Sequence, residues 1–229
     1  MQYGEQLIDG GWYYLTPMTG AVDYGWAWLP DSNKWVYYDP ISGRMWHGSV
    51  WIDGKPYYLD AYTGERLSKQ KMVNRLVSIA SSQNGTTSAD AYVNALTSTG
   101  ADPDPYGPCM TFVWWCFHQA EFDNQLMDGQ PNAWPHVTAD WYSSRGRLMS
   151  SPEPGDIWLV NQPYIAGNPA GLSATHAGLV SSVEYNTNGS VAYVYVWQHV
   201  NGWVHLVRED PYHVYAGQVT GYARPDYNE

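Results

Sequence analysis

The sequence is poor in cysteine, in phenylalanine and in charge. Its 229 residues include only two cysteines, Cys109 and Cys116, which excludes a disulfide framework. Charged residues make up 14% of the chain and the formal net charge is −11. This balance argues against nucleic acid or an anionic membrane as a partner, because both recruit Lys and Arg. No apolar run is long enough to cross a bilayer, and the start of the chain has no basic segment followed by an apolar one, so neither membrane insertion nor a secretory signal is expected.

Tryptophan and tyrosine are abundant instead. The chain holds 13 Trp and 20 Tyr against 3 Phe, whereas a plain hydrophobic core would use Phe freely. Trp and Tyr are favoured where a ring faces a ligand and keeps a polar edge in water. Faces of sugars and quaternary ammonium groups are typical ligands of such surfaces.

Residues 1–67 contain an internal repeat. The aromatic segments Trp12-Tyr-Tyr-Leu15, Trp35-Val-Tyr-Tyr-Asp39 and Pro56-Tyr-Tyr-Leu-Asp60 are each followed by Gly four or five residues later. A period near twenty residues is typical of a stacked array whose single units cannot bury their own faces. Turn residues such as Asp53-Gly54 between the aromatic runs predict that each unit is a short β-hairpin.

This pattern resembles the choline-binding and glucan-binding wall-anchoring repeats, whose consensus runs GW, then WYYL, then G-x-M. Met45 fits the last position, whereas Val22 and Glu65 depart from it, and Ser49 and Pro56 replace expected tryptophans. The resemblance implies a ligand site built from rings shared by consecutive units. The predicted wall-ligand residues are Trp26, Trp28, Trp35, Tyr37, Trp51 and Tyr57. The alternative is that these rings only hold the hairpins together.

Residues 68–229 follow a different pattern. Ser68 is a plausible N-cap for a helix that should end near Asn84-Gly85, and residues 110–122 read as a second, buried helix. After residue 150, β-branched and aromatic runs separated by turns predict strands at 155–160, 176–180, 191–197 and 203–207. Helices followed by an antiparallel sheet make an α+β domain.

Two residues of this domain suggest nucleophilic chemistry. Cys109 lies at the start of the buried helix, where unpaired amides and the helix dipole favour a thiolate. His176 begins a predicted strand and can serve as the base that a thiolate requires. A cysteine at a helix start that meets a histidine on a strand is the arrangement of papain-like enzymes. Cys116 lies about 10 Å further along the helix, too far to form a bridge, and is expected to be a packed core residue.

The segment Tyr106-Gly-Pro-Cys-Met-Thr-Phe-Val-Trp-Trp-Cys116 resembles the signature of CHAP amidases, which are related to NlpC/P60 peptidases. Pro154-Gly-Asp-Ile157, Thr175-His-Ala-Gly-Leu-Val180 and Thr220-Gly-Tyr-Ala-Arg-Pro-Asp-Tyr227 resemble the family's later segments in the same order. The resemblance implies an α+β papain-like cysteine hydrolase domain, preceded here by an all-β repeat array. It makes Cys109 the nucleophile and His176 the general base.

The third catalytic position departs from that family. Relatives usually carry Glu one strand after the histidine, whereas this chain has Gln198. Gln198 can accept a hydrogen bond from the imidazole and fix its tautomer, but it supplies no negative charge. His199 is a second candidate, although its side chain should point to the opposite face of the strand from that of Gln198.

No cofactor is expected, and the histidines show no metal-ligand spacing, which argues against zinc. Asp102 and Asp104 form a D-x-D step just before Cys109, and some relatives bind Ca²⁺ with such a step. Prolines stiffen this loop and no further carboxylate follows closely, so a solvated acidic turn is the favoured alternative to a calcium site.

The sequence thus predicts a peptidoglycan hydrolase that cleaves an amide of the stem peptide or cross-bridge through a thioester. Peptidoglycan and a choline-bearing teichoic acid or glycan are the expected partners, and the bacterial cell wall is the expected place of action, as for a phage or prophage endolysin. Two alternatives stay open. One is a non-catalytic wall-binding or adhesin protein with a degenerate hydrolase domain, and the other is a transpeptidase or toxin that uses the same Cys–His pair.

Overall fold

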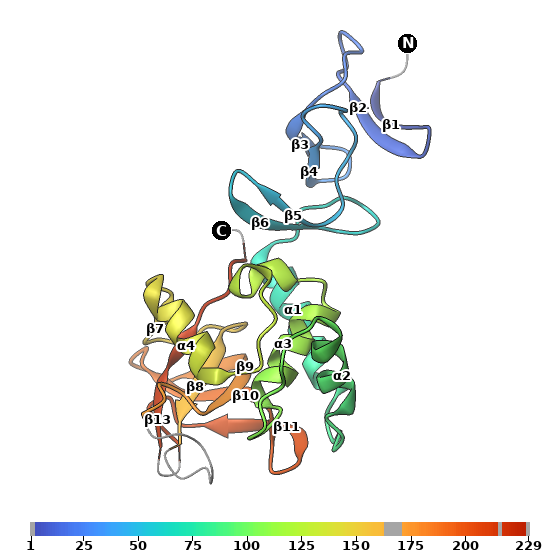
Figure 1. The fold of residues 1–229 in the computed structure, drawn as a ribbon. Coiled ribbons are helices and arrows are strands. Elements are labelled where there is room, and N and C mark those ends of the chain that lie inside the picture. Colours follow the sequence, from blue (N-terminus) through green and yellow to red (C-terminus); the bar gives the residue numbers. More distant parts are fainter. Residues whose placement is uncertain (1–2, 163–170, 215–216, 228–229) are drawn as a thin grey trace. The chain divides into compact units, whose positions relative to one another are not determined.

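The computed structural model describes residues 3–162, 171–214 and 217–227 (Figure 1). These residues form two compact units. The first unit reaches Lys69 and includes Tyr227, and the second spans Gln70–Asp226.

The first unit consists of short antiparallel hairpins, as the repeat predicts. Strands β1 (Gly4–Ile8) and β2 (Gly11–Leu15) pair, as do β3 (Gly25–Leu29) with β4 (Lys34–Tyr38), and β5 (Gly48–Ile52) with β6 (Lys55–Leu59). Asp53 and Gly54 connect β5 to β6 with φ values of 51° and 74°. Positive φ at both central residues is the hairpin turn that matches the twist of the strands, and Asp-Gly is favoured there.

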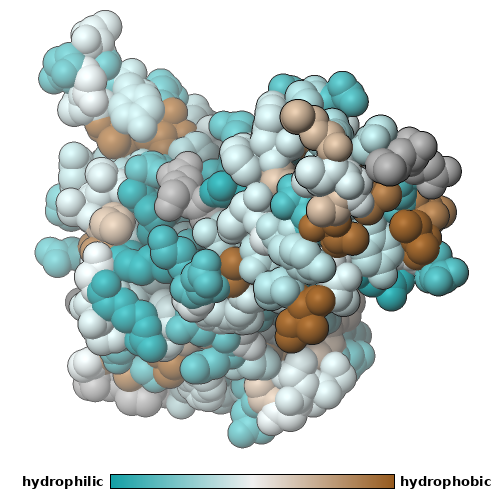
Figure 2. All heavy atoms as spheres, turned by 90° about the horizontal axis from the view of Figure 1, so that it is seen from above, coloured by the Kyte–Doolittle hydropathy of each residue, from teal (hydrophilic) through white to brown (hydrophobic). Residues whose placement is uncertain are grey.

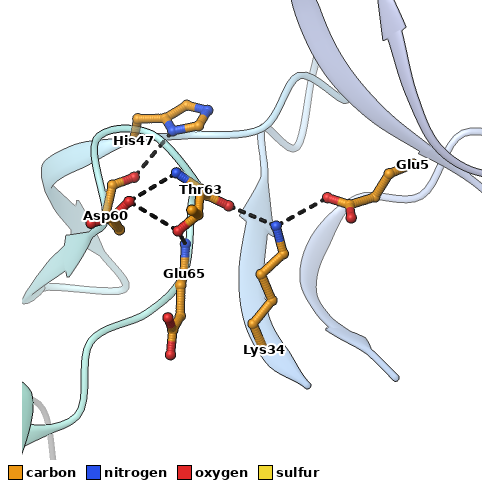
Figure 3. Close-up of polar contacts among 6 residues, drawn as sticks. All are labelled: Glu5, Lys34, His47, Asp60, Thr63 and Glu65. Atoms are coloured by element: carbon orange, nitrogen blue, oxygen red, sulfur yellow. Dashed lines mark hydrogen bonds and ion pairs between the residues drawn. The ribbon is translucent and has the colours of Figure 1, made fainter. Parts of the chain in front are cut away.

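A second turn follows each hairpin and is held by an aspartate in the later two repeats. The carboxylate of Asp60 accepts hydrogen bonds from the Thr63 backbone N–H at 2.8 Å and from the Thr63 hydroxyl at 2.9 Å (Figure 3). Asp39 makes the same contacts with Ser42, at 2.6 and 3.0 Å. Asp side chains favour such turns because they bond the backbone two or three residues on.

Contacts between consecutive repeats stabilise the array. The backbone N–H groups of Met45 and Arg66 donate to the carbonyls of Trp12 and Trp35, each at 2.8 Å. Lys34 lies between repeats, because its ammonium pairs with Glu5 at 3.3 Å and donates to the Thr63 carbonyl at 2.8 Å (Figure 3). A small core fills the interior of the second repeat; its buried residues are Ala27, Leu29, Val36, Tyr38 and Met45.

Helices precede the sheet in the second unit. They are α1 (Lys69–Ser82), α2 (Asp90–Ser98), α3 (Cys109–Gln119) and α4 (Pro135–Ser144), with 3-10 turns at Asp123–Gln125 and Met127–Gly129. The apolar pattern predicted α1 and α3, whereas α2 and α4 were not predicted. Helix α3 is buried along most of its length and packs against β9 and β10 (Figure 1).

The sheet of the second unit is antiparallel throughout. Its strands are β7 (Leu148–Met149), β8 (Ile157–Asn161), β9 (His176–Tyr185), β10 (Val191–Val200), β11 (Trp203–Glu209), β12 (His213–Val214) and β13 (Gly217–Ala223). Their order is β11-β10-β9-β8-β13-β12, with β7 also paired to β13. The predicted α+β order of helices followed by an antiparallel sheet agrees with this arrangement.

The face drawn in Figure 2 is mostly hydrophilic to neutral, with separate hydrophobic spots. Within the described ranges, no helix combines the length and the apolar character needed to cross a membrane.

The turn glycines provide a stability test. Gly43 has φ 72°, and a Cβ there would lie 2.3 Å from Val22 Cγ1 in the preceding repeat. Gly54 has a similar φ of 74°, but a Cβ there would meet nothing within 4 Å. We expect Gly54→Ala to cost about 1–2 kcal/mol through backbone strain alone. Gly43→Ala should cost about 1–3 kcal/mol more because it also overpacks the repeat contact. Urea unfolding of the full chain, followed by tryptophan fluorescence, measures both, and equal losses would contradict this account of stacking.

Candidate functional site

Cys109 and His176 line one cavity of about 340 Å³ in the second unit. The loop before α3, the start of β9 and the connection between β10 and β11 form its walls. The lining residues are Asp104, Tyr106, Gly107, Pro108, Cys109, Gln162, Thr175, His176, His199, Val200, Asn201 and Gly202. The fold therefore brings together the two residues that the sequence motifs predict to react.

Cys109 is the first residue of α3 and is 6% exposed. Its sulfur accepts a hydrogen bond from the backbone N–H of Ala177, the residue that follows His176. Burial raises the pKa of the Cys109 thiol to about 12, and the negative charge of Asp104 adds to this rise. Burial thus opposes the predicted thiolate in the resting site, because desolvation outweighs the hydrogen bonds from backbone N–H groups at the helix start.

His176 begins β9, where it pairs with Val160 of β8. The backbone of Thr175 donates to the Val160 carbonyl at 2.8 Å, which fixes the entry of the strand. The imidazole meets the buried Trp158 ring edge to face, with ring centroids 5.8 Å apart. Burial lowers the pKa of His176 and raises that of Cys109, so both shifts disfavour a thiolate–imidazolium pair in the resting site.

Gln198 contacts His176 from the neighbouring strand β10. Its Oε1 lies 2.5 Å from His176 Nε2, which leaves Nδ1 as the ring nitrogen that can serve Cys109. Gly178 makes room for this contact, because a Cβ there would lie 3.2 Å from Gln198 Cβ and 2.4 Å from Val196 Cγ1. The Gly of the His-Ala-Gly segment is thus required by close packing beneath the glutamine.

Glu209 is a member of the site that the sequence reasoning missed. The Nε2 of Gln198 donates to Glu209 Oε1 at 2.8 Å, and the Glu209 side chain is buried. The sequence did contain a signal for Glu209. The Asn201-Gly202 turn sets a register in which Gln198 pairs with His205, and Glu209 lies four residues after His205, on the same face of β11. An acidic residue in that phase of a half-buried strand indicates a polar partner inside.

His199 and Cys116 occupy supporting positions. His199 also lines the cavity, and its Nε2 is buried with no hydrogen-bond partner, while Gln198 rather than His199 bonds His176. Cys116 is fully buried, and both cysteines are free thiols, as the spacing predicts.

The two aspartates before Cys109 lie in different environments. Asp102 is exposed, whereas Asp104 lines the cavity and accepts a hydrogen bond from the Tyr106 backbone at 2.9 Å. Burial raises the pKa of the Asp104 carboxyl, so Asp104 is not part of a fully solvated turn. Across the part of the chain that the structure describes, no group of three His, Cys, Asp or Glu side chains is arranged to hold a metal ion.

The predicted wall-ligand rings of the first unit fall into two sets. In the first set, Trp26 contacts Tyr37 and Tyr57 edge to face, with centroid distances of 5.1 and 5.0 Å. The Arg66 guanidinium lies 5.7 Å from the Trp26 ring centroid and 5.4 Å from that of Tyr57. These rings are in mutual contact and already hold a cation from the chain itself.

The structure also changes the alignment of the third repeat at Arg66. The isolated bridges Tyr38 to Met45 and Leu59 to Arg66 are equivalent, so Arg66, and not Glu65, takes the position of the consensus methionine. The Arg66 guanidinium, which replaces the thioether of the consensus methionine, therefore lies against the rings of Trp26 and Tyr57.

The second set is open. Trp28 and Trp35 are directly cross-strand on the β3–β4 hairpin, with ring centroids 5.7 Å apart. They are 44% and 46% exposed, and Trp51 of the next hairpin is 43% exposed. Large exposed rings of this kind can receive an apolar or cationic ligand.

The chain matches no protein-family model and no curated protein sequence. Among solved structures it is similar to choline-binding protein F from Streptococcus pneumoniae, crystallised with a peptidoglycan analogue, at 35% identity over 30% of this chain and 22% of that one, with a TM-score of 0.28. It is similar to the choline-binding domain of another S. pneumoniae protein at 25% identity over 29% of this chain and 96% of that one, with a TM-score of 0.26. It is also similar to CbpJ from S. pneumoniae at 28% identity over 30% of this chain and 29% of that one, with a TM-score of 0.21. The chain thus spans only about a fifth of the length of choline-binding protein F.

The electrostatics of Cys109 yield a test. Because the Asp104 charge raises the thiol pKa, Asp104→Asn should lower that pKa and enlarge the thiolate fraction at a fixed alkaline pH. The variant should therefore react faster with iodoacetamide, and the pH midpoint of its alkylation should fall. Asp102→Asn, an exposed change of the same type, should leave the midpoint where it is. A midpoint that rises or stays constant in Asp104→Asn would contradict the assignment.

Proposed function

We propose that this protein is a wall-directed cysteine hydrolase that cleaves an amide of peptidoglycan. The observation that supports this most strongly is the shared cavity of Cys109 and His176, in which His176 Nε2 is held by Gln198. A nucleophile, a base and a group that orients the base are the three parts that such chemistry requires. The sequence motifs around Cys109 and His176 also resemble those of CHAP amidases, and they follow in the same order.

In the proposed reaction, His176 Nδ1 accepts the thiol proton as the Cys109 sulfur attacks the amide carbon. In this proposal the backbone N–H groups at the start of α3 stabilise the oxyanion that forms. The C–N bond breaks, the amine leaves with the proton from His176, and a thioester remains on Cys109. Water, deprotonated by His176, then releases the acid and restores the thiol.

The raised thiol pKa shapes this mechanism. Because burial disfavours the thiolate and the imidazolium alike, the proposed proton transfer accompanies attack and does not precede it. Substrate that fills the cavity would displace water and hold its amide beside Cys109. A protonated thiol requires this positioning before it can attack. No metal or cofactor takes part in the proposed steps.

The first unit is proposed to hold the enzyme on the wall polymer. The exposed Trp28 and Trp35 pair offers faces for the ammonium of a choline-bearing teichoic acid or for a glycan. Attachment raises the local substrate concentration and adds nothing to the chemical step itself. Action at the bacterial cell wall, in the manner of an endolysin, follows from this proposal.

A second candidate is a wall-binding protein without catalysis. The observation that favours it is the burial of Cys109, which keeps the thiol protonated at neutral pH. The two candidates share the binding role of the first unit and differ only in the fate of the amide.

Cleavage distinguishes these candidates. The full chain should release new fragments from purified peptidoglycan, and Cys109→Ala should reduce their formation by about a thousandfold or more. Cys116→Ala is the matched control, because it removes the other buried free thiol and should retain activity if the fold, checked by circular dichroism, is kept. Mass spectrometry detects the fragments and identifies the bond. No fragments from the wild type across several wall types would favour the wall-binding candidate.

Wall attachment is tested separately. Trp28→Ala and Trp35→Ala should each weaken binding to choline-bearing walls by about threefold to thirtyfold. Trp203→Ala is the control, because that ring is 40% exposed but belongs to the second unit. Co-sedimentation with purified walls, with and without free choline, measures the change. If the Trp203 variant loses as much binding as the other two, the role of the Trp pair is wrong.

A further inference from the structure

A continuous buried hydrogen-bonded chain extends from His176 to a carboxylate. His176 Nε2 bonds Gln198 Oε1 at 2.5 Å, and Gln198 Nε2 donates to Glu209 Oε1 at 2.8 Å. The three residues are 5%, 2% and 8% exposed, respectively. They come from three neighbouring strands, β9, β10 and β11, of one sheet.

The carboxylate gives this chain a direction. An ionised carboxylate only accepts hydrogen bonds, so Gln198 must present its NH₂ group to Glu209. The carbonyl oxygen of the same amide then faces His176. A carbonyl oxygen also only accepts, so a neutral His176 must carry its proton on Nε2 and leave Nδ1 unprotonated.

The same contact compensates for the charge that Gln198 lacks. When His176 takes the thiol proton it becomes an imidazolium, which a nearby negative charge stabilises. Glu209 supplies that charge through Gln198, whose amide lies between Glu209 and His176 and is polarised by the carboxylate. Burial strengthens the effect, because the interaction passes through a medium of low dielectric.

We propose that Glu209 is the positioning residue of this site, which acts through Gln198 to fix the Nε2–H tautomer of His176 and to stabilise its protonated form. The kinetic part of this inference rests on the proposed hydrolase function, whereas the tautomer part does not. Glu209, on β11, thus supplies the negative charge that a glutamate usually supplies in CHAP amidases.

Other titratable groups face this chain and bear on its pH dependence. Burial raises the pKa of the Glu209 carboxyl, whereas the hydrogen bond from Gln198 and the charge of His205, the cross-strand partner of Gln198, favour its ionised form. His199 opposes protonation of His176, and Asp104 acts on Cys109 at the far side of the cavity. Removal of the Glu209 charge should lower the pKa of His176, because burial and His199 oppose the imidazolium while the Gln198 hydrogen bond that favours it loses the polarising carboxylate.

The first experiment reads the tautomer directly, without catalysis. Full-length protein labelled with ¹⁵N-histidine is examined by long-range ¹H–¹⁵N NMR, with His176→Gln used to assign the His176 signals. The wild type should show the Nε2–H form. Glu209→Gln should convert it to a mixture with the Nδ1–H form and lower the titration midpoint of His176. Glu184→Gln, an exposed change of the same kind on β9, should alter neither. An unchanged tautomer and midpoint in Glu209→Gln would overturn the proposal.

The second experiment exchanges the two groups. Q198E alone sets two carboxylates at hydrogen-bond distance and should impair the site. The double variant Q198E/E209Q places the carboxylate beside His176 with an amide behind it, and should recover the wild-type tautomer. On peptidoglycan, E209Q should lower the cleavage rate about 10- to 100-fold, the loss expected for a charge-assisted hydrogen bond, and the double variant should restore it. A double variant that behaves like E209Q, in tautomer as in rate, would contradict the role of Glu209.

The two readouts separate the claims. If the wild type cleaves no wall, the hydrolase function fails while the NMR result still decides the role of Glu209. If the wild type cleaves and only the NMR difference is missing, Glu209 fails while the hydrolase function stands.

Discussion

The hydrogen bond from Gln198 to Glu209 is the interaction on which the arrangement of the buried polar chain His176–Gln198–Glu209 depends. Buried polar groups must be paired, and an acceptor-only carboxylate at the end of a chain determines every donor and acceptor before it. The sheet order places β9, β10 and β11 side by side, so the chain can run across them. Gly178 keeps the space that lets the Gln198 side chain lie between the strands. In the proposed mechanism, His176 on β9 is thus positioned by a residue of β11, with β10 between the two strands.

The first unit obeys a different constraint. A two-stranded hairpin is too small to bury its own faces, so each repeat depends on its neighbours. Regular backbone hydrogen bonds such as Met45 to Trp12 keep the repeats in register, and Lys34 joins Glu5 to Thr63 between them. Rings such as Trp26 are consequently in contact with rings of the same and the next repeat, whereas the Trp28–Trp35 pair is more exposed.

Local patterns in the sequence predicted much of this structure. The hairpins followed from the aromatic repeat, and α1, α3 and the main strands followed from apolar periodicity. Helix α2 was missed because only Tyr92 and Leu96 are buried in its nine residues, which leaves almost no stripe to detect. The Cys109–His176 cavity was predictable because both residues lie at element starts. Its electrostatics were not, since the desolvation that raises the pKa of Cys109 depends on packing. Likewise, the Arg66 contact with Trp26 and Tyr57 joins residues of different hairpins, which no local pattern records.

The central claim is that Cys109 attacks an amide carbonyl held in the cavity beside His176. A peptidoglycan stem peptide that carries an aldehyde in place of the scissile amide tests it most directly, because only a nucleophile at the reacting position can add to that carbon. With ¹³C at the aldehyde carbon, NMR should show the thiohemiacetal carbon in the wild type and in Cys116→Ala but not in Cys109→Ala, and natural peptidoglycan should slow its formation. Absence of an adduct in the wild type, or an adduct that persists in Cys109→Ala, would contradict the account.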